Sequence, residues 1–563
     1  MQTTPTTNDE APLRFKTWVA SGDPWIWITG SGVTISLIAV VGLLLLMAIR
    51  GMGHFWPSDV MRTSYQDANG TTTVIVGELV ESEEVTAARV RDSGYQPADG
   101  KTFLRRDLIK IGNRDAFSQD FRWLLVDRMG PVSYPKELLV LERREWGNAY
   151  GALVAVKENG QLVASGNSAW AELQRRVERT HSLFTEIHGI EKSEIGAINY
   201  AIERLRLKER GLERTGQLTA VAALEIKEDR AKYQADYSDV QKRLGVLYAE
   251  IRRDSITLRI SDGSEREISL AKVVRVYRPN DMGVVAKIRF YCEKLWEFVS
   301  DEPRESNTEG GIFPAIFGTV LMVVVMSILV MPLGVMAAVY LREYAKQGLL
   351  TRLVRIAVNN LAGVPSVVYG VFGLGFFVYF MGGRIDQLFF SEALPAPTFG
   401  TPGLLWSSVV LALLTLPVVI VSTEEGLTRI PRSIREGSLA LGATQAETLW
   451  RVVLPMAAPG IMTGLILSVA RAAGEVAPLM MVGVVKLAPS LPLDSNFPFL
   501  HLDRKFMHMG FHIYDVGFQS PNVEAARPLV YATALLLVVV VIVLNIAAIH
   551  MRNRLRERYR GAE

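Results

Sequence analysis

The sequence predicts a mostly α-helical membrane protein with six transmembrane helices and, after the first of them, an inserted α+β domain that contains a helical hairpin. Hydrophobic residues make up 49% of the 563-residue chain and the mean hydropathy is positive, which disfavours a purely soluble protein. Six windows are apolar enough to cross a bilayer, which takes about 20 helical residues. Five of these windows lie in the last part of the chain, so a long polar segment follows the first.

The six apolar windows set the expected domain boundaries. They cover 25–49, 312–341, 356–381, 402–422, 456–485 and 528–549. The first runs from "WIWITGSG" into "LLLLMAI", which is too long for a signal-peptide core, and no small-x-small cleavage site follows it. We therefore expect a retained membrane anchor. The other five windows form a five-helix membrane core over 312–549.

The short loops alternate between basic and basic-poor, which predicts the orientation of the chain. The 342–355 and 423–455 loops each carry several basic residues, whereas 382–401 carries only Arg384. The 550–563 tail carries five arginines. Both this basic tail and the 1–24 tail are therefore expected in the cytoplasm. Because each span crosses the membrane once, the segments on the two sides alternate. This alternation places 50–311 and the 486–527 loop outside the cytoplasm.

Segment 50–311 has no membrane character and alternates strand and helix patterns. Strands are expected at 71–80, 149–165 and 255–277, the last with a Ser-Asp-Gly-Ser turn. Three-and-four spacing of apolar residues from Leu173 to Leu205 predicts one helix, and 217–252 predicts a second. We expect a helical hairpin on a small β-rich base, with apolar faces that serve as core or partner surface.

Composition and motifs exclude several function classes. A net charge of +3 is too balanced to indicate a nucleic-acid partner. The single cysteine, Cys292, excludes an intrachain disulfide and has no partners for a metal site, so we expect it to be buried and inert. "GYQPADGKT" (94–102) resembles a phosphate-binding P-loop, but five residues separate its glycines where that loop has four. The chain is therefore not expected to hydrolyse ATP or to be an enzyme.

A short, half-polar stretch at 436–455, "EGSLALGATQAETLWRVVLP", lies between two apolar windows. Pro431 can open a first helix, and Gly442 supplies a left-handed helix stop. Thr444, with Glu447 three residues on, forms a capping box for a second helix. One apolar face of that helix carries Ala446, Leu449, Trp450 and Val453. This hinged pair of helices either docks on a partner or packs on its own bundle.

The same stretch resembles the "EAA" loop of bacterial ABC-importer permeases. Glu436 lies six residues before Gly442, and Leu454-Pro455 closes the motif. In that family the loop inserts a coupling helix into a groove on a separate ATPase subunit. The resemblance therefore implies that Glu436, Gly442, Leu454 and Pro455 belong to an ATPase-coupling site within the cytoplasmic 423–455 loop.

Two further stretches resemble the A-subunit permeases of phosphate-specific (Pst) importers. They are "GVPSVVYGVFGLGFF" (363–377) and "SVARAAGEVAPLMMV" (468–482). The resemblance covers 312–549 and the first span, and it implies a core of the ABC-importer permease (MetI-like) type. It departs at 50–311, where the common form has only a short loop. The chain thus resembles such a permease with a large extra extracytoplasmic domain.

Across the six apolar windows only two residues are charged, Arg471 and Glu475, and both lie in the fifth window, 456–485, near its middle. Charges in a bilayer are costly, so such residues face a bundle interior or a water-filled path. Their spacing of four places them on one helix face, where they can pair. A guanidinium fork suits phosphate oxygens, which favours a substrate-pathway or gating role. The alternative is a structural ion pair that locks two helices.

Small and helix-breaking residues within the spans predict hinges and close packing. Pro332 and Pro365 interrupt backbone hydrogen bonding where they stand. Gly363 and Gly370 would allow the third span to approach its neighbours. Each of these positions has a packing explanation as well as a functional one.

The resemblance implies a permease subunit of an ATP-driven phosphate importer in a bacterial inner membrane, with 50–311 in the periplasm. Its expected partners are a second permease subunit in a heterodimer, an ATPase dimer that binds ATP and Mg, and a periplasmic phosphate-binding protein. Phosphate and the lipid bilayer complete the set, and this chain itself is expected to hold no cofactor. Two alternatives stay open. One is a permease for another oxyanion, and the other is a membrane-anchored sensor with 50–311 as its receptor.

Overall fold

The computed structural model describes residues 18–67, 70–92, 102–346, 348–520 and 523–560. The P-loop-like stretch 94–102, except for Thr102, and residues 1–17 of the amino-terminal tail lie outside the described residues. Six helical stretches of the described chain are long and apolar enough to span a membrane, which confirms the predicted number. They are Asp23–Phe55, Phe313–Tyr344, Ser366–Phe389, Leu404–Thr428, Gln445–Gly474 and Ala526–Leu555.

The helical bundle is built around α13 (Leu404–Thr428). This helix packs against α9 (Phe313–Val339) and α16 (Leu454–Gly474), and α16 in turn packs on α19 (Val523–Arg560). Two thirds of the apolar window of α13 is buried. The core of the bundle includes Met326, Val410, Leu414 and Val469. A helix that is apolar on all sides and buried in this way is typical of the centre of a membrane bundle.

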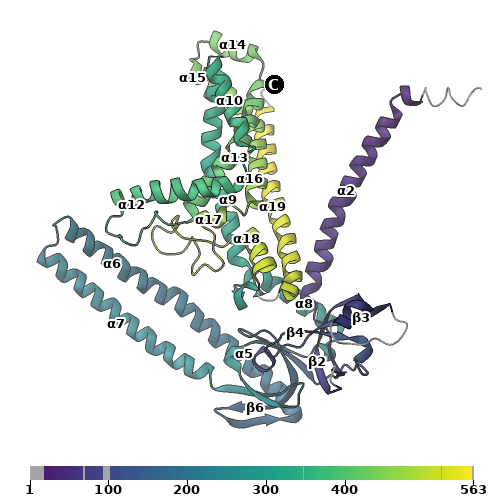
Figure 1. Ribbon diagram of the computed structural model, residues 1–563. Helices are drawn as coiled ribbons and strands as arrows, with labels where there is room; N and C mark the ends of the chain where they lie inside the picture. Colours follow the sequence, from purple (N-terminus) through teal and green to yellow (C-terminus); the bar gives the residue numbers. More distant parts are fainter. Residues whose placement is uncertain (1–17, 68–69, 93–101, 347, 521–522, 561–563) are drawn as a thin grey trace, which may run out of the picture.

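The first span, α2 (Asp23–Met52), leans away from the bundle (Figure 1). It meets α19 near its carboxyl end, where a Cβ on Gly51 would lie 2.6 Å from the backbone nitrogen of Ala532. No residue in its apolar window is buried. Such a fully apolar exposed helix is suited to lipid or to another membrane chain.

The third predicted window, 356–381, is wrong as a single helix. α10 (Leu349–Leu361) ends before Pro365, and α11 (Ser366–Phe372) begins after it and continues through a π-helical stretch, 373–382, into α12 (Gly383–Phe389). Proline has no N–H to continue the helix, and it disfavours helical backbone before it. The apolar span therefore lies at Ser366–Phe389.

The shifted third span contains charges that the predicted window did not. Arg384 and Asp386 lie in α12. The Asp386 carboxylate is fully buried and accepts hydrogen bonds from the backbone nitrogens of Phe399 (2.8 Å) and Gly400 (2.7 Å). This carboxylate therefore has a structural explanation, because it holds the loop that follows α12.

The inserted domain (residues 50–311) is built on antiparallel sheets. One sheet has the order β1-β2-β3-β4, and a larger one has the order β10-β5-β6-β8-β9 with β7 paired to β6. The predicted strands at 71–80, 149–165 and 255–277 correspond to β2, to β6 and β7, and to β8 to β10. The strands are β1 (Val60–Gln66), β2 (Thr72–Thr86), β3 (Phe103–Lys110), β4 (Phe121–Leu125), β5 (Leu138–Arg143), β6 (Ala149–Glu158), β7 (Gln161–Ser165), β8 (Asp254–Arg259), β9 (Glu265–Ser269) and β10 (Val273–Tyr277), with a short β11 (Pro303–Arg304) and β12 (Glu309–Gly310) pair.

Helices of the inserted domain extend from these sheets. α5 buries Leu173 and Val177 against the larger sheet, and the predicted hairpin is formed by α6 and α7 (Figure 1). Apolar residues at the predicted three-and-four spacing are buried at the base of the hairpin. There Ile187, from the end of α5, packs in one cluster with Val240 and Leu244 of α7. The helices are α3 (Ala87–Asp92), α4 (Arg114–Phe117), α5 (Ala169–Gly189), α6 (Gly196–Arg214), α7 (Ala220–Ile251) and α8 (Val284–Ser300).

The inserted domain meets the bundle at two places. At its base, the rings of Phe55 and Phe298 lie 5.0 Å apart, so the segments that enter and leave the domain are adjacent. Farther along, α6 reaches the loops of the bundle. Tyr200 donates to the carbonyl of Phe497, and Arg214 Nη1 donates to the carbonyl of Ser391 at 2.9 Å.

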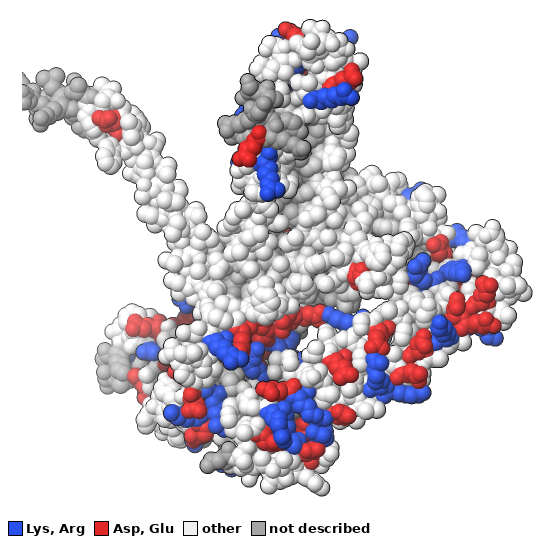
Figure 2. Space-filling view, turned by 180° about the vertical axis from the view of Figure 1, so that it is seen from behind, with Lys and Arg blue, Asp and Glu red and all other residues white. Residues whose placement is uncertain are grey.

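The surface separates into charged and uncharged zones. On the face that Figure 2 shows, acidic and basic side chains gather on the inserted domain and at the opposite end of the bundle, while the zone between is largely free of them. An uncharged zone of this kind matches the hydrocarbon layer of a membrane. The expectation that Cys292 is buried is wrong, because α8 exposes it. Its helix turns this position outward, away from the buried Phe290 and Phe298.

Candidate functional site

The end of the bundle remote from the inserted domain carries the 423–455 loop. After α13 the chain forms α14 (Arg432–Ala440) and then α15 (Gln445–Thr448). Between them Gly442 adopts a φ of +91°, which confirms the predicted left-handed stop. The predicted capping box is also confirmed, because the Thr444 side chain accepts from the Glu447 backbone nitrogen and the Glu447 carboxylate accepts from that of Thr444.

The second helix of this loop does not stop before the next span. From Gln445 to Gly474 the chain is one helix, with a π-helical stretch at 449–453 directly before α16. Pro455 lies in the first turn of α16, where the loop ends and the span begins, and the helix is continuous across this point. A π-turn is one of the ways in which a helix accommodates a local irregularity such as proline. The loop and α16 are thus joined by continuous helix.

The predicted apolar face of this helix is divided between two environments. Leu449 and Val453 are buried in a cluster with Leu427 and Val339 of the bundle. Trp450, by contrast, is 70% exposed.

Leu441, beside the Gly442 hinge, is 91% exposed. Two large apolar side chains, Leu441 and Trp450, therefore stand in solvent at the tip of the loop, and exposure of this kind marks a docking surface more often than a core. Of the other predicted coupling residues, Glu436 is exposed on α14, and Leu454 and Pro455 are half-buried in the first turn of α16.

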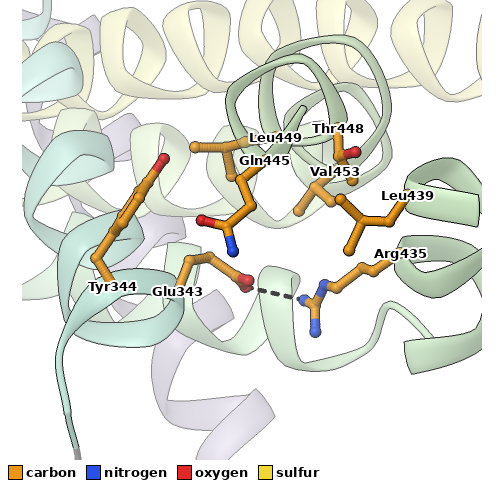
Figure 3. A pocket seen from close by; sticks show the side chains of 8 residues that line it. All are labelled: Glu343, Tyr344, Arg435, Leu439, Gln445, Thr448, Leu449 and Val453. Atoms are coloured by element: carbon orange, nitrogen blue, oxygen red, sulfur yellow. Dashed lines mark ion pairs between the residues drawn. The ribbon is translucent and has the colours of Figure 1, made fainter. Parts of the chain in front are cut away.

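A small cavity of about 140 Å³ lies behind the loop, between α14, α15 and the end of the α9 helix (Figure 3). Its lining includes Glu343, from the π-helical end of α9, and Arg435, from α14. Arg435 Nη2 lies 3.0 Å from Glu343 Oε1. Residues 92 positions apart in the chain are thus paired, and sequence reasoning gave no signal for this contact because neither charge stands out within its own loop.

The predicted charged pair lies at the end of α16. Arg471 Nε lies 3.6 Å from Glu475 Oε1, which is an ion pair but too long for a hydrogen bond. Arg471 is in the last turn of α16, and Glu475 is the capping residue with an extended ψ of 131°. The prediction that both lie near the middle of a continuous 456–485 span is wrong, since Gly474 and Pro478 interrupt that window.

The surroundings of Arg471 are partly polar. Its side chain is 33% exposed and that of Glu475 21%, so neither is sealed in apolar packing. Tyr369 of α11, which the sequence did not single out, lies near Arg471, and its hydroxyl donates to the carbonyl of Leu361 at 2.8 Å. Within the described residues the Arg471 guanidinium makes no hydrogen bond. Its fork of donors is therefore available to an anion.

The predicted hinge residues fall at different kinds of position. Pro332 lies inside α9, whereas Pro365 caps α11 in the break that follows α10. A Cβ on Gly370 would lie 2.8 Å from the Cα of Pro478, so this glycine allows α11 to approach the segment that carries Glu475. Gly363 has no such close neighbour, since its nearest contact would be 3.4 Å away.

No metal centre accompanies these residues. Among the described residues, no group of three or more histidine, cysteine, aspartate or glutamate side chains is arranged to hold a metal ion.

Comparison with known proteins shows the family to which this chain belongs. The family described as binding-protein-dependent transport system inner membrane component matches residues 330–560. The phosphate transport system permease protein PstA 1 of Mycobacterium tuberculosis is 36% identical over 250 residues, which cover 43% of this chain and 71% of that protein. The phosphate transport system permease protein PstA of Mycobacterium leprae is 36% identical over 225 residues, which cover 39% of this chain and 68% of that protein. A chain of the inward-facing MetNI methionine ABC transporter is 19% identical, with coverage of 43% and 94% and a TM-score of 0.32.

The chain therefore belongs to the binding-protein-dependent inner membrane permeases of ABC transporters. Within that family it is similar to the phosphate transport permeases named PstA. It is a multi-pass inner membrane protein and, like its relatives, a transport permease rather than an enzyme. The family match begins at residue 330, so the inserted domain lies outside it. Membership in this family implies an ATPase and a substrate-binding protein as partners.

Proposed function

We propose that this chain forms the phosphate pathway of an ATP-driven importer together with a second permease subunit. The observation that carries the proposal is the half-exposed guanidinium of Arg471, beside Glu475 and Tyr369, with no hydrogen-bond partner within the described residues. Guanidinium binds phosphate oxygens in a bidentate manner. The identity to phosphate transport permeases supports phosphate as the anion.

Coupling to ATP hydrolysis would pass through the 423–455 loop. The exposed Leu441 and Trp450 offer apolar contacts to a separate ATPase dimer. ATP and Mg²⁺ would be bound by that dimer and not by this chain. Because the helix runs without a break from Gln445 to Gly474, a push on the loop would reach Arg471. Alternating access would then expose the pathway first to one side of the membrane and then to the other.

The orientation follows from the same proposal. In this proposal the 423–455 loop faces the ATPase in the cytoplasm. Both termini would then be cytoplasmic, and the inserted domain, at the opposite end of the bundle (Figure 1), would be periplasmic. The basic residues of the 423–455 loop support this orientation. A periplasmic phosphate-binding protein would deliver the anion at the end that carries the inserted domain.

Uptake of radiolabelled phosphate tests the proposal. The complete complex is reconstituted in vesicles with its binding protein outside and ATP inside, and arsenate, sulfate and molybdate are added as competitors. We expect ATP-dependent phosphate uptake that arsenate, the closest analogue, reduces most. Uptake that sulfate or molybdate abolishes while phosphate is a poor substrate would assign the pathway to another oxyanion.

A further inference from the structure

Two arginines, Arg435 and Arg355, each contact the ends of both α9 and α13. At the end remote from the inserted domain, Arg435 of α14 pairs with Glu343 at 3.0 Å and also donates from Nη2 to the carbonyl of Leu427 at 2.9 Å. Glu343 belongs to the π-helical end of α9, and Leu427 to the last turn of α13. The Arg435 side chain therefore bridges α9 and α13.

Arg355 of α10 makes the reciprocal bridge. Its Nε lies 3.5 Å from Glu424 Oε1 of α13, and its Nη2 donates to the carbonyl of Leu341, at the end of α9, at 3.3 Å. Each arginine thus takes a carboxylate from one helix and a carbonyl from the other, with the two roles exchanged. Arg355 reaches its two acceptors with two different nitrogens, Nε and Nη2, whereas the Nη2 of Arg435 lies near both of its acceptors.

The environment of these bridges strengthens them. Arg435 and Glu343 are both mostly buried, and Figure 3 shows them facing each other beneath the segment that carries Gln445 and Leu449. A charge pair that is largely removed from water is screened less than one on the surface. The cavity of about 140 Å³ beside the pair leaves room for the arginine to shift.

We propose that Arg355 and Arg435 are positioning residues that hold the ends of α9 and α13 together, and that Arg435 also fixes α14 to them, so that a push on the loop moves α9 and α13 together. The proposal rests on the proposed function, in which the 423–455 loop receives the motion of an ATPase. Without the Arg435 bridge, α14 keeps the hydrogen bond between the Ser438 and Thr448 hydroxyls but loses its link to α9 and α13, and ATP hydrolysis is no longer converted into movement of the spans.

Pulsed electron paramagnetic resonance on the full complex tests the geometry. Spin labels are placed at Ser433→Cys on α14 and Met336→Cys on α9, both in a Cys292→Ser background. We expect one narrow distance distribution in the parent protein and a clearly broader one in Arg435→Gln, which removes the only bridge of the two that starts from α14. Arg432→Gln, an exposed arginine on the same helix, is the matched control and should leave the distribution narrow. An unchanged distribution in Arg435→Gln would overturn the proposal.

The ratio of phosphate imported to ATP hydrolysed tests the consequence. In reconstituted vesicles we expect Arg435→Gln and Arg355→Gln each to lower this ratio several-fold. Arg355→Lys should lower it as well, because Arg355 reaches its two acceptors with two different nitrogens and an ammonium has only one. A variant that lowers the yield of complex but keeps the ratio would show a merely stabilising role and refute the positioning role. If the parent complex hydrolyses ATP yet imports no phosphate, the proposed function fails, whereas the distance comparison still decides the positioning role.

Discussion

Arg471 and Glu475 form an ion pair across the end of a helix, with 3.6 Å between Nε and Oε1, rather than a pair stacked on one continuous helical face. The arginine also lies in the last helical turn, where the helix dipole favours a cation. A structural role and a substrate role both agree with this position, and they predict different behaviour when both charges are removed together.

The double variant Arg471→Met with Glu475→Gln separates the two roles. Removing one partner of an ion pair costs up to about 1 kcal/mol at the surface and about 3–5 kcal/mol when the pair is buried. The partly buried pair of Arg471 and Glu475 should lie between these limits. Removing both should therefore restore assembly of the complex. We expect assembly without phosphate uptake, and the same failure in Arg471→Lys. Robust uptake by the double variant would show that Arg471 is only structural.

The exposed native cysteine makes the orientation testable without a new label in the inserted domain. Cys292 should react with a membrane-impermeant maleimide in intact spheroplasts, because α8 exposes it and the domain is proposed to be periplasmic. In a Cys292→Ser background, Ser433→Cys should react only after the cells are lysed. Labelling of Ser433→Cys in intact cells would reverse the orientation and remove the loop from any cytoplasmic ATPase.

Gly442→Val should uncouple the loop through backbone strain alone. A Cβ at this position would meet nothing within 4 Å, so space is not limiting, but a φ of +91° costs a side chain about 1–3 kcal/mol. We expect loss of the ATPase on purification and loss of uptake, with the bundle still inserted. Gly437→Val is the matched control, because Gly437 is also in open space but has helical backbone. Equal behaviour of the two variants would disprove the role of the left-handed stop.

Glu78 of the inserted domain should make stability depend on pH. Burial raises the pKa of Glu78 from its ordinary 4.5 to about 7. The folded state therefore binds this proton more tightly than the unfolded state, and the resulting stability, present in full below pH 4.5, is lost as pH rises to 7. Glu78→Gln removes that loss, so above pH 7 it should be more stable than the parent by up to about 3 kcal/mol.

Thermal unfolding of the complex in detergent at pH 4.5 and pH 8 measures this difference. Glu84→Gln, an exposed position on the same strand, should follow the parent at both pH values. A Glu78→Gln variant that gains nothing between pH 4.5 and pH 8 would contradict the buried-carboxylate explanation.

Features that depend on neighbouring residues were predictable from the sequence. The number of spans, the Gly442 stop and the Thr444 capping box each follow from a few consecutive side chains. The helix breaks near Pro365 and Gly474 also had local signals, but an apolar window averages over a proline or a glycine and conceals them. The positions of the third and fifth spans were wrong for that reason.

Features that depend on distant contacts were not predictable. Glu343 and Arg435 are ordinary loop charges until the fold brings α9 and α14 together. Tyr369 is one aromatic residue among many in an apolar span, and nothing in the sequence links it to Arg471, which lies about a hundred positions away in α16. Cys292 was expected inside on composition alone, although which side of α8 faces the core depends on the packing around Phe298.

The contact between Phe55 and Phe298 has a consequence for how such a chain could arise and be shortened. The two segments that connect the inserted domain to the bundle are neighbours at their point of exit, so a few residues would suffice to join them. Closing a long loop costs little more chain entropy than closing a short one, because the cost grows only with the logarithm of length. A permease could therefore gain or lose the entire domain by one recombination event without a change in the register of its membrane helices.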